Sequence, residues 1–166
     1  MNVNFINPFI ESIREVLSTM ALTEAHSAEP YLKNGTRPLG VITGFIKMEG
    51  ELTRGSIAIS FERETVLQIC HNMLGEDVPG INDAVRDLVG ELTNMLTGGA
   101  KRRLWEMGFN FELATPEIHT EDVYRVEHLV EGPVLVIPFV TNSGRFFIEV
   151  CFADARMHAE VGRFTL

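Results

Sequence analysis

The sequence has little positive charge, few cysteines and no long apolar run. Its 166 residues contain 14 Lys and Arg against 23 Asp and Glu, so the formal net charge is −9 at pH 7. Nucleic-acid binding needs clustered Lys and Arg against phosphate, and an acidic chain is poorly suited to it. The basic cluster Lys101 to Arg103 falls at the end of an expected helix, where cations complement the helix dipole. We therefore expect no nucleic-acid partner.

No apolar run in this chain approaches the roughly 20 residues that a membrane span requires. The first ten residues lack the basic segment and the small-residue cleavage site of a signal peptide. The two cysteines, Cys70 and Cys151, fit reduced and buried thiols better than a disulfide framework. These observations predict a cytoplasmic protein without a membrane partner.

Familiar metal and nucleotide motifs are also missing from the sequence. The five histidines show no i, i+4 pair and no HExxH segment, so they predict no metal site. Neither the glycine pattern of dinucleotide-binding folds nor that of phosphate-binding loops occurs. We expect a protein with no cofactor of its own.

The hydrophobic period changes at Gly108, and this change defines the expected fold. Apolar residues at helical spacing predict helices over 8–20, 62–74 and 82–107. Alternation of apolar and polar residues predicts strands over 41–48, 56–61, 109–118, 122–130, 133–140 and 145–152. Strands joined by short links predict an α+β fold, a mainly antiparallel sheet flanked by two long helices and a shorter one.

Local signals set the expected boundaries of these elements. Asn7 can cap the first helix with Pro8 in its first turn, and Ser60 can cap the second. Residues 21–38 suggest a short edge strand and a loop. We expect one domain over 1–152, followed by a tail, 153–166, that is either a short helix or disordered.

The long helix over 82–107 separates its polar and apolar residues. At 100° per residue, its apolar side chains gather on one side, and a polar stripe about 120° wide occupies another. This stripe consists of Asp87, Glu91, Asn94, Gly98, Lys101 and Arg102. Trp105 extends it, and either packs under a loop or touches a partner.

A solvated helix face would also explain such a stripe. Two residues argue against that explanation. Asn94 is a poor helix former where Glu, Lys or Gln would serve an exposed face better. Gly98 costs about 1 kcal/mol relative to Ala inside a helix, and no core contact requires it on this side. A missing side chain at Gly98 would allow another protein's backbone to approach closely.

Residues 87–101, Asp-Leu-Val-Gly-Glu-Leu-Thr-Asn-Met-Leu-Thr-Gly-Gly-Ala-Lys, resemble the signature of the CheX/CheC/FliY phosphatases of bacterial chemotaxis. That signature is an Asp or Ser, three residues, Glu, two residues and Asn, with a Pro further on. Here Pro116 follows Asn94 after 21 residues. The segments 6–10 and 73–76 are also similar to CheX. Arg14 stands where a second motif on the first helix would place Asn, so one motif per chain matches CheX.

The resemblance implies that the chain dephosphorylates the aspartyl phosphate of a phosphorylated CheY-type response regulator. Asn94 would orient the attacking water and Glu91 would pair with a lysine of the partner. Asp87, Gly98 and Lys101 would lie at the partner contact. The resemblance also implies a homodimer, and it places Mg²⁺ in the partner rather than in this chain. The alternatives are a non-catalytic adaptor or flagellar-switch module that keeps the docking surface, and a structural dimerisation domain.

Overall fold

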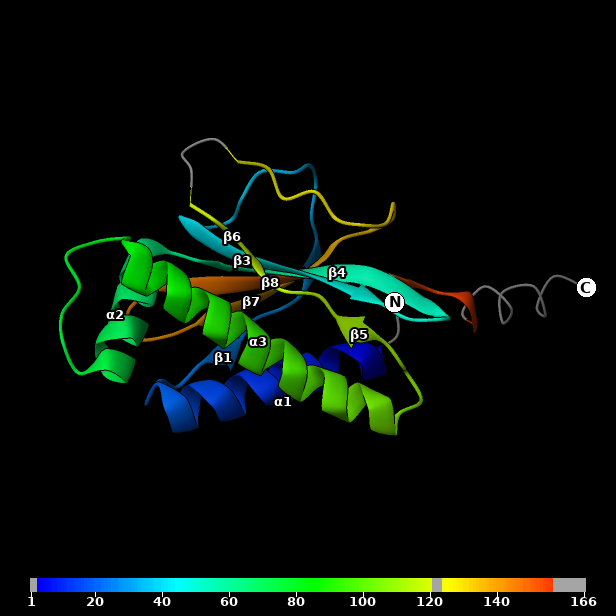
Figure 1. Cartoon of the computed structure of the whole chain (residues 1–166), viewed down its shortest axis with the longest axis horizontal. Coiled ribbons are helices and arrows are strands. Elements are labelled where there is room, and N and C mark those ends of the chain that lie inside the picture. Colours follow the sequence, from blue (N-terminus) through cyan, green and yellow to red (C-terminus); the bar gives the residue numbers. More distant parts are fainter. Residues whose placement is uncertain (1–2, 121–123, 157–166) are drawn as a thin grey trace, which may run out of the picture.

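The computed structural model describes residues 3–120 and 124–156, which form an antiparallel sheet with its long helices on one face (Figure 1). The strands are β1 His26–Ser27, β2 Tyr31–Leu32, β3 Ile42–Glu49, β4 Thr53–Phe61, β5 Glu112–Leu113, β6 Glu117–His119, β7 Leu135–Val140 and β8 Arg145–Asp154. Their order across the sheet is β1-β7-β8-β4-β3-β5, with β2 also on β7 and β6 also on β3. Every pair within these residues is antiparallel, which confirms the expected α+β class.

The helices are α1 Val3–Met20, α2 Arg63–Leu74 and α3 Asp83–Glu106. α1 and α3 lie side by side across one face of the sheet, and α2 lies near the N-terminal end of α3 (Figure 1). Alternate residues of the central strand β4, namely Ile57, Ile59 and Phe61, face these helices and are almost fully buried. None of these helices, in the ranges the structure describes, has the length and apolar character needed to cross a membrane.

α1 begins earlier than its capping signals predicted. The helix starts at Val3, so Asn7 is not its cap and Pro8 lies inside it. The reason is the ring of Phe5, which is fully buried. Its centroid lies 3.7 Å from that of Phe152 and 5.6 Å from that of Phe9. Burying an aromatic side chain stabilises the extra turn enough to offset one backbone hydrogen bond that Pro8 cannot make.

The start of α2 also differs from the prediction. Its N-cap is Glu62, without a side-chain capping bond, whereas Ser60 belongs to β4 and shares a 2.7 Å hydrogen bond with Thr43. β4 begins at Thr53, three residues before the expected start. α2 ends at Leu74, as predicted, and Gly75 follows it in a left-handed conformation with φ 74°, with its N–H donating to the carbonyl of His71.

The region after Gly108 contains the largest error. The single strand expected over 109–118 is two short strands, β5 and β6, that both pair with β3. Pro116, which has no N–H, lies between them. The strand expected over 122–130 is wrong for 124–130, which is irregular, and 121–123 lie outside the described residues. β8 continues to Asp154, while the tail prediction for 157–166 falls outside the described residues.

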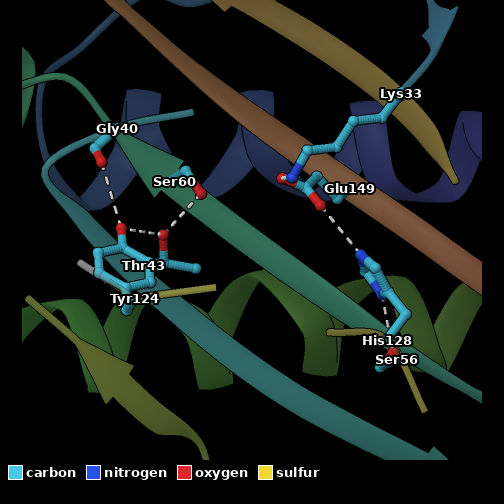
Figure 2. A network of polar contacts seen from close by, with 8 residues as sticks. All are labelled: Lys33, Gly40, Thr43, Ser56, Ser60, Tyr124, His128 and Glu149. Atoms are coloured by element: carbon cyan, nitrogen blue, oxygen red, sulfur yellow. Dashed lines mark hydrogen bonds and ion pairs between the residues drawn. The ribbon is translucent and has the colours of Figure 1, made fainter. Parts of the chain in front are cut away.

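The irregular segment 124–130 covers the face of the sheet opposite α1 and α3. Tyr124, Val126 and His128 alternate toward that face, which explains the strand-like pattern in the sequence. The Tyr124 hydroxyl bonds Thr43 at 2.7 Å and donates to the Gly40 carbonyl at 3.2 Å (Figure 2). The alternation in 124–130 therefore arises because every second side chain contacts the sheet, although the segment is not a strand of the sheet.

A buried network of ionic and hydrogen-bonded side chains lies on the same face of the sheet (Figure 2). The Lys33 ammonium donates to Glu149 at 2.7 Å, and Nε2 of His128 lies 3.0 Å from the other carboxylate oxygen. The side chains of Lys33, Glu149 and His128 are 4%, 0% and 4% exposed. Nδ1 of His128 lies 2.8 Å from the Ser56 hydroxyl, which also accepts from the N–H of Leu129. The network ties two covering segments to strands β4 and β8.

Candidate functional site

The rotation of α3 about its axis is set by two close contacts. The first is with the sheet, where a Cβ on Gly44 of β3 would lie 2.0 Å from Oγ1 of Thr93. Thr93 therefore packs directly on the strand backbone, and its hydroxyl donates to the Val89 carbonyl at 2.7 Å. The helix begins at Asp83 and is capped by Asn82, whose side chain accepts from the N–H of Val85 at 3.1 Å.

The second contact is with α1. A Cβ on Gly99 would lie 2.1 Å from Oγ of Ser12, and this hydroxyl donates to the Leu96 carbonyl at 2.8 Å. Gly99 therefore packs closely against α1. With Asp87 at 0°, Thr93 lies at about 240° and Gly99 at about 120°. Both residues pack against the rest of the protein, and the midpoint between their angles, about 180°, is opposite Asp87. Asp87 therefore faces solvent.

The predicted site residues share this outward face. Asp87, Glu91 and Asn94 are exposed, and a Cβ on Gly98 would meet no atom within 4 Å outside the helix backbone. Successive members are three or four residues apart, which places neighbouring Cβ atoms about 5–6 Å from one another. Among the residues the structure describes, none forms a side-chain hydrogen bond or ion pair with Asp87, Glu91 or Asn94. We call the outward-facing line Asp87, Glu91, Asn94, Gly98, Arg102 and Trp105 the α3 ridge.

Lys101 differs from the other predicted residues. Its ammonium donates to the carboxylate of Glu112 on β5 at 2.8 Å, so it leans toward the sheet edge. Arg103 turns the opposite way and pairs with Glu11 and Glu15 on α1. The Arg103 guanidinium holds the pKa of the Glu15 carboxyl below its usual range. Two of the three basic residues in the cluster are therefore occupied within the chain.

Strand β6 lies beside the α3 ridge, and no local sequence pattern predicted this neighbour. Arg86 of α3 donates to the Thr120 hydroxyl and, at 3.3 Å, to the Ile118 carbonyl. Cδ1 of Ile118 would lie 3.8 Å from a Cβ on Gly90. These contacts join residues about thirty positions apart in sequence, so helical periodicity could not reveal them.

Two other groups in the molecule bear on chemistry. Ser56, His128 and Glu149 have the order of a hydrolytic triad, but the Ser56 side chain is fully buried and cannot reach a substrate. Cys70 and Cys151 are buried and free, as predicted, and burial raises the pKa of the Cys70 thiol to about 11. No three His, Cys, Asp or Glu side chains of the described residues come close enough together to hold a metal ion.

An antiparallel sheet with two long helices on one face is the fold of CheC/CheX-like chemotaxis proteins, to which this chain is similar over most of its length. A family model described as chemotaxis phosphatase CheX matches residues 42–140. The chain therefore belongs to the CheX family.

Solved structures agree with this assignment. The chain is 47% identical to a chemotactic CheC-like protein from Shewanella oneidensis MR-1, with 92% of this chain and 99% of that one covered and a TM-score of 0.81. It is 44% identical to the chemotaxis protein CheX from Vibrio vulnificus, with 90% and 99% covered and a TM-score of 0.84. The CheX of a CheX-CheY-BeF3-Mg complex from Borrelia burgdorferi is 21% identical, with 92% and 100% covered and a TM-score of 0.75, and shows the shared fold. No curated protein sequence matched the chain.

Proposed function

We propose that this chain is a cytoplasmic phosphatase that hydrolyses the aspartyl phosphate of a phosphorylated CheY-type response regulator in chemotaxis. The observation that carries the proposal is the pair Glu91 and Asn94, one helical turn apart on a helix whose rotation is set by two close contacts. Neither side chain has a polar partner among the described residues, so both are available to another protein. The CheY in the Borrelia burgdorferi complex supports the choice of partner.

In the proposed reaction a water oxygen attacks phosphorus in line with the bond to the aspartyl oxygen. That P–O bond breaks, the aspartate leaves as a free carboxylate, and inorganic phosphate carries the water's atoms. Mg²⁺ held by the regulator would neutralise charge on the phosphoryl oxygens, so this chain needs no metal ligands of its own. The task left to this chain is to hold the water in position.

Asn94 suits that task because a carboxamide both donates and accepts hydrogen bonds and does not titrate. Its exposed position lets it enter the partner's phosphorylation site. Glu91 would pair with a cationic side chain of the regulator and so set the register of docking. Asp87 would lie at the edge of the contact, and Lys101 could join it only in competition with Glu112.

The test is the variant Asn94→Ala in single-turnover dephosphorylation, with enzyme in saturating excess over a CheY-type regulator charged by acetyl phosphate. We expect on the order of a 10²-fold loss of rate, since misplacing a reactant by about 1 Å costs that much. Affinity for the beryllofluoride-charged regulator should change little. The matched control is Asn34→Ala, an exposed asparagine in the segment leading to β3. A wild-type rate for Asn94→Ala at saturation would refute the water-positioning role of Asn94. A wild-type protein that does not accelerate dephosphorylation above the regulator's own rate would indicate a non-catalytic adaptor.

A further inference from the structure

Trp105 is the single tryptophan of the chain and lies on the outward face of α3. It follows Asp87 by 18 residues, or five complete turns, so the two residues point in the same direction. The described part of the chain leaves 59% of Trp105 exposed, so the interpretation that it packs under a loop is wrong. An indole that is more than half exposed gains little from the fold, and tryptophan is enriched among residues that anchor protein interfaces.

Between Asn94 and Trp105 the outward face of α3 carries Gly98, which has no side chain, and we call the surface formed by Gly98, Arg102 and Trp105 the saddle. Its floor is Gly98, where a side chain would have open space. Lys101, the neighbour that could have covered the floor, is drawn aside to Glu112. Arg102 stands beside Trp105, exposed and without a carboxylate at ion-pair distance among the described residues. Backbone from another protein could therefore approach the helix closely at this point.

We propose that the saddle formed by Gly98, Arg102 and Trp105 is the second half of the docking surface for the phosphorylated response regulator. Trp105 is its anchor and Gly98 its floor. The inference rests on the proposed function, because it takes the regulator's phosphate to be at Asn94. It adds a recognition element that acts on binding and not on the chemical step.

The typical size of protein–protein interfaces supports the response regulator as the protein that covers the saddle. A specific interface covers about 800 Å² per partner, which corresponds to a disc of about 16 Å radius. Trp105 lies eleven residues beyond Asn94, or about 16 Å along the helix. A regulator centred on Asn94 therefore reaches Trp105 without any change in the fold.

The charges along the ridge give the contact a direction. Asp87 and Glu91 make its first half acidic, and Arg102 makes its second half basic. Complementary potentials favour one orientation and disfavour the reverse. The regulator should present a cationic group toward Glu91, and an acidic or carbonyl-rich surface toward Arg102.

The first test uses the fact that the chain has one tryptophan. Protein labelled with 5-fluorotryptophan gives a single ¹⁹F resonance, from Trp105. We expect this resonance to shift when the beryllofluoride-charged CheY-type regulator is added. An unshifted resonance at saturation overturns the proposal. A resonance that moves with the protein's own concentration, and not with the regulator, also overturns it and assigns the saddle to self-association.

The second test separates binding from turnover. Trp105→Ala should raise Kd and KM at least about tenfold, as expected for an interface anchor, and leave the saturated single-turnover rate unchanged. Trp105→Phe should restore most of the affinity. The control is Leu32→Ala, since Leu32 on β2 is 61% exposed. If Trp105→Ala binds like wild type while Asn94→Ala is inactive, this inference fails and the proposed function stands. A wild-type protein that does not accelerate dephosphorylation of the regulator would instead refute the proposed function.

Gly98 provides an independent test in which stability and binding move in opposite directions. Gly98→Ala should raise the thermal midpoint, because alanine is the better helix former and its Cβ meets no neighbour. The same variant should weaken regulator binding severalfold. Gly90→Ala is the matched control, since its Cβ would make an ordinary 3.8 Å contact with Ile118 and so faces β6. If Gly98→Ala binds as tightly as Gly90→Ala, the saddle is not a contact.

Discussion

The hydroxyl of Ser12 on α1 occupies the place that a side chain on Gly99 of α3 would need. A Cβ on Gly99 would lie 2.1 Å from Ser12 Oγ, which also donates to the Leu96 carbonyl at 2.8 Å. The two helices therefore approach closely enough for a side-chain hydroxyl to bond the backbone of its neighbour. The adjacent Gly98 has open space on its side of the same turn.

This contrast predicts opposite effects for two neighbouring glycines. Gly99→Ala should lower the free energy of unfolding by about 1–3 kcal/mol, the usual cost of overpacking. Gly98→Ala should raise it by up to about 1 kcal/mol. Urea unfolding of the two variants beside wild type measures both. Equal effects would mean that α1 and α3 are not packed as described.

Glu91→Ala should weaken regulator binding at least about tenfold and also slow turnover, because a charge pair sets both affinity and register. Glu91→Lys should be worse, since it would repel a cationic partner group. Binding measured at two salt concentrations should show the wild-type affinity falling with salt more steeply than that of Glu91→Ala. Glu24→Ala, an exposed glutamate after α1, is the control. Identical salt slopes for wild type and Glu91→Ala would contradict the charge pair.

Glu149→Ala should destabilise the fold by about 3–5 kcal/mol, because it leaves Lys33 and His128 buried without their shared carboxylate. Glu117→Ala removes a carboxylate that is 53% exposed and should stay within about 0.5 kcal/mol of wild type. Chemical denaturation gives both values. A small effect at Glu149 would mean that the buried contacts of Lys33 and His128 with this face of the sheet contribute little to stability.

Asp154 predicts a loss of stability in acid. The hydrogen bond from Arg156, together with that from Thr53, lowers its pKa from 3.8 to about 2. A lowered folded-state pKa contributes stability above pH 3.8, and this stability is lost as the pH falls toward 2. The contribution is roughly 2 kcal/mol. Unfolding measured from pH 6 to pH 2 should show the difference between wild type and Asp154→Asn shrinking with acid. A constant difference would contradict the assignment.

The homodimer remains a prediction. Sedimentation equilibrium at micromolar concentration should give twice the 18.6 kDa mass of the chain. A species of single-chain mass under these conditions would contradict it. The strands at both ends of the described sheet are only two or three residues long. Short edges offer little backbone for pairing, so any dimer should use side-chain surfaces more than sheet extension.

Sequence reasoning succeeded where the determining interactions are local. The approximate bounds of α3 and the outward direction of Asp87, Glu91 and Asn94 follow from helical periodicity, and the structure agrees. The end of α2 at Leu74, before Gly75, also depends on local residues. The roles of Glu91 and Asn94 in catalysis are predictions that geometry alone does not test.

The errors came from contacts between distant parts of the chain. The early start of α1 depends on Phe5 packing against Phe152, which no local signal contains. The alternation in 124–130 is real, but the segment lies over the sheet instead of pairing in it. The position of Lys101 depends on Glu112, which follows the end of the helix. In each case a tertiary contact overrides a locally reasonable interpretation.

The contacts of Thr93 with Gly44 and of Gly99 with Ser12 have an evolutionary consequence. Because inward-facing contacts such as these set the orientation of α3, the outward residues can change without disturbing the folded core. Partner preference and foldability are then controlled by different positions on one helix. A lineage, or a designer, could retarget such a chain to another regulator by substitutions at 87, 91, 98, 102 and 105 while Asn94 is kept.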